Sequence, residues 1–131
     1  MKIILSIKPQ FAEKIFEGSK QFEFRRTIFK NKDVKKIVVY ASAPISKIVG
    51  EFEVNEVLNH EINFLWKETK EYSGISRQYY LDYFKGKESG YAIKIDNPKK
   101  YKNQKCIRKT YGITPPQSFA YIKNTKHNKS N

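Results

Sequence analysis

The sequence is poor in the residues that form disulfides or hold metals. It contains one cysteine, Cys106, and two histidines, His60 and His127. A single cysteine excludes an internal disulfide, which suits a reducing cytoplasm, and no usual metal-ligand spacing is present. We therefore interpret Cys106 as an ordinary free thiol and expect neither a metal nor a cofactor.

Long apolar runs are also missing. No stretch approaches the roughly 20 apolar residues that cross a bilayer. Residues 1–8 are too short for the apolar core of a signal peptide and carry no cleavage site. The sequence therefore predicts a cytoplasmic protein that does not associate with membranes.

Acidic residues are absent from the last quarter of the chain. All 13 of them lie at or before Asp96, whereas nine of the 26 lysines and arginines lie in residues 99–131. A segment of one charge sign attracts polyanions through counterion release, and nucleic acid is the commonest such partner. The abundant Lys, Ile, Asn and Tyr also fit the bias of a low-GC genome. We favour RNA or another nucleic acid as the partner, because no acid offsets the late positive charge.

Alternating and helical hydrophobic patterns divide the chain into short elements. They predict strands over 2–7, 20–28, 36–42, 47–58, 90–95 and 119–122, and helices over 9–17, 61–71 and 77–85. Residues 98–117 are predicted to be a loop, and residues 123–131 a basic, disordered tail. The predicted fold is an α+β domain over residues 1–122, with one early helix and a helical pair inserted between strands. Periodicity alone leaves open whether its five or six strands close into a small barrel or form an open sheet.

The segment from Gly18 to Arg26 concentrates the chemistry of the chain. Strand alternation puts Phe22 and Phe24 on one face and Glu23 and Arg25 on the other, with Lys20 at the start of the strand. These charged groups can bind a polar, planar or anionic ligand, or tune the lysine for acid–base chemistry. The structural alternative is an ion pair that only closes the barrel.

Alternation sends Arg26 toward the aromatic face, so its side chain must leave the strand plane or lie at the end of a barrel. We predict that Arg26 contacts phosphate. Tyr79 and Tyr83 lie one helical turn apart, and surface tyrosines among basic residues are typical of single-strand binding.

The spacing G-x-K-x-x-E-x-R, from Gly18 to Arg25, resembles the signature of the ASCH domain, a PUA-like β-barrel superfamily associated with RNA. The resemblance covers roughly residues 2–122 and implies a small PUA-like barrel. It extends to further segments: Leu5–Pro9, Tyr40–Ser42, Gly50, the region around Trp66, Tyr72–Ile75, Tyr83–Phe84 and Pro115–Ser118.

The resemblance also implies where the pocket lies. In this superfamily the end of the first strand, here Ser6 and Lys8, lines the same pocket as the G-x-K turn. Tyr40 and Ser42 end the central strand and are expected to face it, and Gln117 can hydrogen-bond a base edge. Together these residues predict a small concave site for a flipped or single-stranded base.

Two classes of function are open at this point. The first, which we favour, is an RNA-binding module that reads a single-stranded or modified base in RNA processing or in the regulation of transcription or translation. The second, implied by the resemblance, is a ribonuclease or a small hydrolase that removes the acyl group of acetylated cytidine. In that hydrolase subgroup a threonine stands at the position of Glu23, so only Lys20 carries over directly. Lys20 and Glu23 are the candidate catalytic residues, and Glu68 or Glu71 is the candidate for a further carboxylate.

Overall fold

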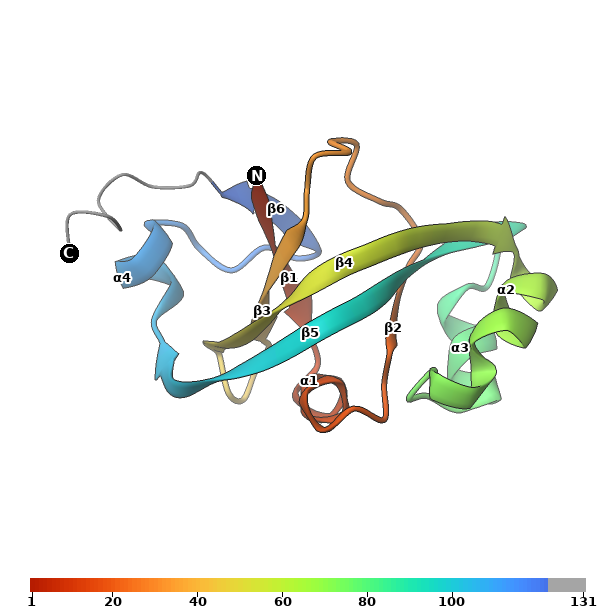
Figure 1. Ribbon diagram of the computed structural model, residues 1–131, viewed down its shortest axis with the longest axis horizontal. Coiled ribbons are helices and arrows are strands. Elements are labelled where there is room, and N and C mark those ends of the chain that lie inside the picture. The colour runs from red at the N-terminus through yellow and green to blue at the C-terminus, as the bar shows by residue number, and fades with distance from the viewer. Residues whose placement is uncertain (123–131) are drawn as a thin grey trace.

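Six strands form one mixed sheet in the computed structural model, which describes residues 1–122 (Figure 1). β1 and β3 are parallel, and the other neighbouring strands are antiparallel. The spatial order is β2-β5-β4-β3-β1-β6, so β2 and β6 are the two ends of the ladder. The α+β class is confirmed, and the predicted tail lies outside the described residues. The strands are β1 (Lys2–Ile7), β2 (Phe22–Arg25), β3 (Lys36–Ala41), β4 (Lys47–Glu61), β5 (Ser89–Lys105) and β6 (Phe119–Ile122).

The helices begin and end where the sequence supplies caps. The early helix α1 (Pro9–Glu17) starts on a proline and ends at Gly18, whose φ is 96° and whose N–H donates to the carbonyls of Lys14 and Ile15. The predicted helical pair lies between β4 and β5, where Glu61 and Ser76 cap the two N-termini. It comprises α2 (Ile62–Thr69), a 3₁₀ turn, η1 (Lys70–Tyr72), and α3 (Arg77–Tyr83).

Three hydrophobic clusters fill the space between the sheet and its helices. The first holds α1 against β1 and β3, and the second holds Ile107 of the short helix α4 (Ile107–Tyr111) against alternate residues of the same strands. The third joins Phe22 and Phe24 of β2 to Tyr80 of α3. The prediction that Phe22 and Phe24 form a buried face is therefore confirmed. Figure 1 shows the long β4–β5 ribbon running from α4 at one end to α2 and α3 at the other.

β5 is much longer than its sequence pattern predicts. The pattern predicts a strand over 90–95, but pairing with β4 resumes after Asn97 and Pro98 and continues to Lys105. The register shifts between Glu51 and Glu53: Glu51 pairs with Lys99 and Glu53 with Asp96, so β5 has one extra residue in this interval. Proline is tolerated at such a bulge because the extra residue need not donate to the ladder. The loop predicted over 98–117 is consequently wrong for the remainder of β5 and for α4.

At Gly50, α1 and β5 approach β4 closely. A glycine inside a strand is typical of a bulge or of a close approach by another segment. A Cβ placed on Gly50 would overlap the backbone oxygen of Lys99 and the ring of Phe16. Glycine therefore lets α1 lie directly on the ribbon, which fixes the helix that forms one wall of the site.

No helix among the described residues is long and apolar enough to span a membrane.

Candidate functional site

Lys20 is a buried lysine with an exposure of only 2%. Its ammonium donates to the backbone oxygen of Ser73 at 2.7 Å. The same nitrogen lies 5.4 Å from the ring centroid of Phe11 and 5.0 Å from that of Phe24. The cation is thus held by one carbonyl and two aromatic faces, an arrangement that replaces little of its hydration.

Short backbone contacts fix the position of Lys20. After the turn at Gly18, the N–H of Lys20 donates to the oxygen of Lys14 at 3.1 Å, and the N–H of Gln21 donates to the oxygen of Tyr72 at 2.8 Å. Gly74 packs against the side chain, because a Cβ at Gly74 would lie 2.5 Å from the Cβ of Lys20. The segment is therefore clamped between α1 and the turn that follows η1.

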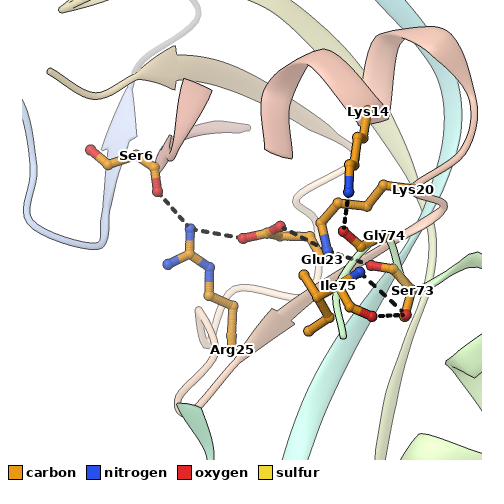
Figure 2. A network of polar contacts seen from close by, with 8 residues as sticks. All are labelled: Ser6, Lys14, Lys20, Glu23, Arg25, Ser73, Gly74 and Ile75. Atoms are coloured by element: carbon orange, nitrogen blue, oxygen red, sulfur yellow. Dashed lines mark hydrogen bonds and ion pairs between the residues drawn. The ribbon is translucent and has the colours of Figure 1, made fainter. Parts of the chain in front are cut away.

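Glu23 connects Lys20 to Arg25 in a line of charges (Figure 2). Its Oε1 lies 4.0 Å from the Lys20 nitrogen, and its Oε2 lies 3.4 Å from Nη2 of Arg25. Nη2 also donates to the backbone oxygen of Ser6 at 3.1 Å. Nε of Arg25 is buried without a hydrogen-bond partner in the described part of the chain. One carboxylate thus faces two cations, which leaves net positive charge and an unused donor at the site.

Burial lowers the pKa of Lys20 to about 8. The charge of Glu23 opposes this shift by raising the pKa, while Lys14 and Arg25 lower it further. About a tenth of Lys20 is therefore a neutral amine at pH 7, because the population changes tenfold for each pH unit below the pKa. A neutral amine in a cleft can accept a proton, which an ordinary surface lysine does not do at this pH.

The lowered pKa predicts that the protein gains stability in mild alkali. Unfolded Lys20 keeps its ordinary value of 10.5, so between pH 8 and 10.5 the unfolded state binds more protons than the folded state. Stability should rise by about 2 kcal/mol between pH 8 and 10 on account of Lys20. Burial raises the pKa values of Tyr80 and Tyr101, which opposes the gain above pH 10.

Urea unfolding of the natural protein and of Lys20→Met, each at about pH 8 and about pH 10, isolates the contribution of Lys20 to the pH dependence of stability. The other titrating groups cancel in the difference between the two proteins. An equal pH response in the two proteins would contradict the assignment.

A cavity of about 130 Å³ opens beside these charges, and we call it the Lys20 cavity. It is smaller than the clefts of roughly 300–1,000 Å³ that take drug-sized ligands, so it suits one small planar or anionic group. Aromatic and aliphatic side chains face polar ones across it. The lining residues are Ser6, Ile7, Lys8, Phe11, Lys20, Glu23, Phe24, Arg25, Ile75, Tyr79 and Tyr83.

Five of the predicted site residues line this cavity, and Lys20, Glu23 and Arg25 form its charged side. Ser6 contributes its carbonyl rather than its hydroxyl, because the hydroxyl donates to the backbone oxygen of Pro116. Lys8 is exposed at the rim, with its ammonium 5.5 Å from the ring centroid of Tyr79. The structure therefore brings these five predicted residues together around one cavity.

The other four predicted residues lie outside the cavity lining. Tyr40 is 6% exposed and packs in the second cluster, because alternation along β3 puts it on the face that α4 covers. The amide of Ser42 donates to the oxygen of Ile7, and Gln117 is exposed on the segment before β6. Arg26 lies just past β2.

Arg26 has a structural role that the sequence did not predict. Its Nη1 donates to the backbone oxygens of Tyr83 at 2.8 Å and Lys85 at 3.0 Å. Tyr83 is the last residue of α3 and Lys85 follows the helix, so the arginine holds the end of α3. The phosphate contact of Arg26 stays a prediction.

The carboxylates proposed from the helical insertion are not in the Lys20 cavity. Glu68 and Glu71 line a separate hollow of about 310 Å³ beside β2 and η1, together with Lys67 and Lys94. Among residues 1–122, no group of three or more His, Cys, Asp and Glu side chains is arranged to hold a metal ion. Glu23 is therefore the carboxylate that accompanies Lys20 in the cavity.

Aromatic side chains complete the cavity wall. Phe11 and Tyr79 meet edge to face with ring centroids 5.1 Å apart, and Tyr83 lies near the opposite end of α3. Helical spacing pointed to Tyr79 and Tyr83, but neither Phe11 nor Ile75 was among the residues that the sequence proposed for the site. Both missed residues enter the wall through contacts between segments distant in sequence, which local patterns do not encode.

Comparison with known proteins gives a consistent picture. The sequence profile of the ASCH domain matches residues 5–105. The chain is 30% identical over 125 residues to the ASCH domain-containing ribonuclease of Zymomonas mobilis, covering 92% of this chain and 83% of that protein. A crystal structure of ASCH from Zymomonas mobilis matches with a TM-score of 0.89 and 26% identity, over 98% of this chain and 92% of that one.

A second kind of relative is longer. The chain is 31% identical over 122 residues to the large ribosomal subunit protein uL22 of Ureaplasma parvum serovar 3. That match covers 92% of this chain and 39% of the relative, so the chain spans about two fifths of that protein's length.

Proposed function

The chain belongs to the ASCH domain family, and from that premise we propose that it binds single-stranded RNA at the Lys20 cavity and cleaves it there. The name of the Zymomonas mobilis relative, a ribonuclease, supports this reaction class. The net charge of +13 supports a polyanionic substrate.

The observation that carries the proposal is the environment of Lys20. A lysine that only contacts phosphate works best as an ordinary charged ammonium at the surface. Lys20 is instead buried, its pKa is lowered to about 8, and it lines a cavity with Glu23 and Arg25. Groups tuned in this way are typical of acid–base catalysis near neutral pH.

The cavity has groups for two requirements of RNA cleavage, a base and a donor that stabilises negative charge. The neutral amine of Lys20 takes the proton of a ribose 2′-hydroxyl, whose oxygen then bonds to the adjacent phosphorus. The bond from phosphorus to the 5′-oxygen breaks, and that oxygen takes a proton from water. Arg25, whose guanidinium lines the cavity, stabilises the charge on the phosphate oxygens. The products are a 2′,3′-cyclic phosphate and a 5′-hydroxyl.

The aromatic wall explains a preference for unpaired RNA. Phe11, Tyr79 and Tyr83 offer ring surfaces beside the charged groups. Bases stack on such rings with a gain of about 1–3 kcal/mol each, and only an unpaired base can enter a cavity of about 130 Å³. The 2′-hydroxyl that the reaction needs also distinguishes RNA from DNA.

The second candidate function is binding without cleavage. One observation favours it: the Lys20 ammonium donates to Ser73, while the Glu23 carboxylate lies 4.0 Å away, outside hydrogen-bond distance. In this function the cavity reads one unpaired or modified base, and the same groups supply affinity and selectivity without turnover.

Replacing Arg25 with glutamine tests the proposal. We expect kcat/KM for a labelled single-stranded RNA to fall about 100-fold, because a charge-stabilising donor at the reacting phosphate is lost. Arg77→Gln is the matched control, since this arginine is exposed at the start of α3, and it should cleave normally.

The natural protein should leave duplex DNA intact. If the natural protein binds single-stranded RNA without cleaving it, and Arg25→Gln lowers the affinity, the second candidate function, binding without cleavage, is established. Cleavage by Arg25→Gln at the natural rate would overturn the role of the cavity.

A further inference from the structure

The end of the molecule away from α2 and α3 is strongly positive. Figure 1 shows α4, the start of β4 and the finish of β5 together at this end. Seven exposed basic residues lie on these three segments, and we call them the basic end. They are Lys47, Lys99, Lys100, Lys102, Lys105, Arg108 and Lys109.

Contacts confirm that the three segments converge. Ile48, the second residue of β4, pairs with Lys105 at the end of β5. Hydrogen bonds from the backbone N–H groups of Lys109 and Arg108 in α4, the former being the larger cause, lower the pKa of the Cys106 thiol. The charges of Lys47 and Lys109 lower it further. Lys47 therefore lies near α4, although more than 50 residues separate them in the chain.

Little inside the protein neutralises this charge. Lys100 pairs with Glu13 at 3.7 Å, and Glu51 is occupied by Lys36 and by the hydroxyl of Tyr101. Within residues 1–122, the side chains of Lys47, Lys99, Lys102, Arg108 and Lys109 form no hydrogen bond or ion pair. Exposed cations gathered in this way raise the local concentration of a polyanion.

The basic end and the Lys20 cavity border the same segments. The chain that leaves α4 reaches Ser6 at the cavity, where Pro116 accepts from the Ser6 hydroxyl and Ser118 accepts from its amide. The ion pair from Lys100 to Glu13 joins β5 to α1, the helix that supplies Phe11 to the cavity wall. A strand with one nucleotide in the cavity can therefore continue over these segments toward the basic end.

We propose that the basic end binds the phosphate backbone of the RNA segment that flanks the nucleotide held in the Lys20 cavity. This inference rests on the proposed function and adds a second subsite to it. The cavity selects and cleaves, whereas the basic end contributes affinity that is independent of sequence and sensitive to salt. Substrates long enough to reach both subsites should bind more tightly than short ones.

A fourfold variant, Lys102→Gln, Lys105→Gln, Arg108→Gln and Lys109→Gln, tests the proposal. The control variant, Lys30→Gln, Lys32→Gln, Lys35→Gln and Lys87→Gln, loses the same four charges from exposed positions elsewhere. For a 20-nucleotide poly-U strand, we expect the first variant to reduce the slope of log K against log salt by about 3, because single strands lose about 0.7 per released contact. The control should change the slope by less than 1.

Cleavage of a trinucleotide separates the two subsites. Because a trinucleotide can place one nucleotide in the cavity but is expected to be too short to engage the basic end as well, both variants should cleave it within about twofold of the natural rate. Equal salt slopes for the natural protein and the first variant, or equal losses in both variants, would overturn the proposal. If the natural protein cleaves nothing, the slopes still decide the question, because they measure binding alone.

Discussion

Lys20→Met should lower kcat/KM for single-stranded RNA about 1,000-fold, within the range that general acid–base catalysis contributes. Methionine keeps the apolar length of lysine against Phe11 and Phe24 but has no proton acceptor. The protein should remain folded, because Arg25 still pairs with Glu23 when the Lys20 charge is removed, and methionine keeps the apolar contacts with both rings. Loss of activity would then reflect chemistry and not unfolding.

The pH dependence of cleavage adds a readout that a structural role would not change. In the natural protein, kcat/KM should rise with pH and level off near pH 8, where Lys20 becomes neutral. Lys87→Met, at an exposed position, is the control and should keep both the rate and the profile. A natural protein whose rate does not depend on pH between 6 and 9 would refute Lys20 as the base.

Gly74→Ala should destabilise the protein by about 3 kcal/mol and also impair cleavage. Gly74 has a φ of 70°, which costs alanine about 1–2 kcal/mol. The new Cβ would also lie 2.5 Å from the Cβ of Lys20 and 2.6 Å from its Cγ, and relieving such overpacking costs about 1–3 kcal/mol more. The lysine must move to make room, and a displacement of about 1 Å at a reacting group can cost about 100-fold in rate.

Gly86→Ala separates these two costs. Gly86 has a φ of 86° but no heavy atom within 4 Å of an added Cβ. This control should lose only the backbone term of about 1–2 kcal/mol and retain cleavage. Chemical denaturation and RNA cleavage should be measured for both variants. Equal effects of the two substitutions would show that Gly74 does not hold Lys20 in place.

The parts of the site that the sequence predicted depend on near neighbours in the chain. Alternation along β2 separates Phe22 and Phe24 from Glu23 and Arg25, and Gly18 ends α1 just before Lys20. Both features follow from backbone geometry over a few residues. The ion pair between Glu23 and Arg25 is therefore a local feature, and the spacing of the two residues along one strand is enough to predict it.

The parts that the sequence did not predict depend on register and on distant contacts. Tyr40 ends the expected strand but packs against α4, because the register of β3 decides which face each side chain takes. The partner of Lys20 is the carbonyl of Ser73, a backbone atom 53 positions away that no side-chain pattern reveals. β5 continues past Pro98 because a bulge in its pairing with β4 removes the need for a donor there.

The hydrogen bond between Ser6 and Pro116 spans 110 positions of the chain. The contact from Lys20 to Ser73 spans 53, and that from Arg25 to Ser6 spans 19. During synthesis, domains acquire structure as the chain emerges, and contacts distant in sequence form late. The charged side of the cavity can thus assemble while the chain is still being made, but the hydrogen bonds from Ser6 to Pro116 and Ser118 must wait until residue 118 has left the ribosome. A nascent chain would carry an incomplete site while it is still close to ribosomal and messenger RNA.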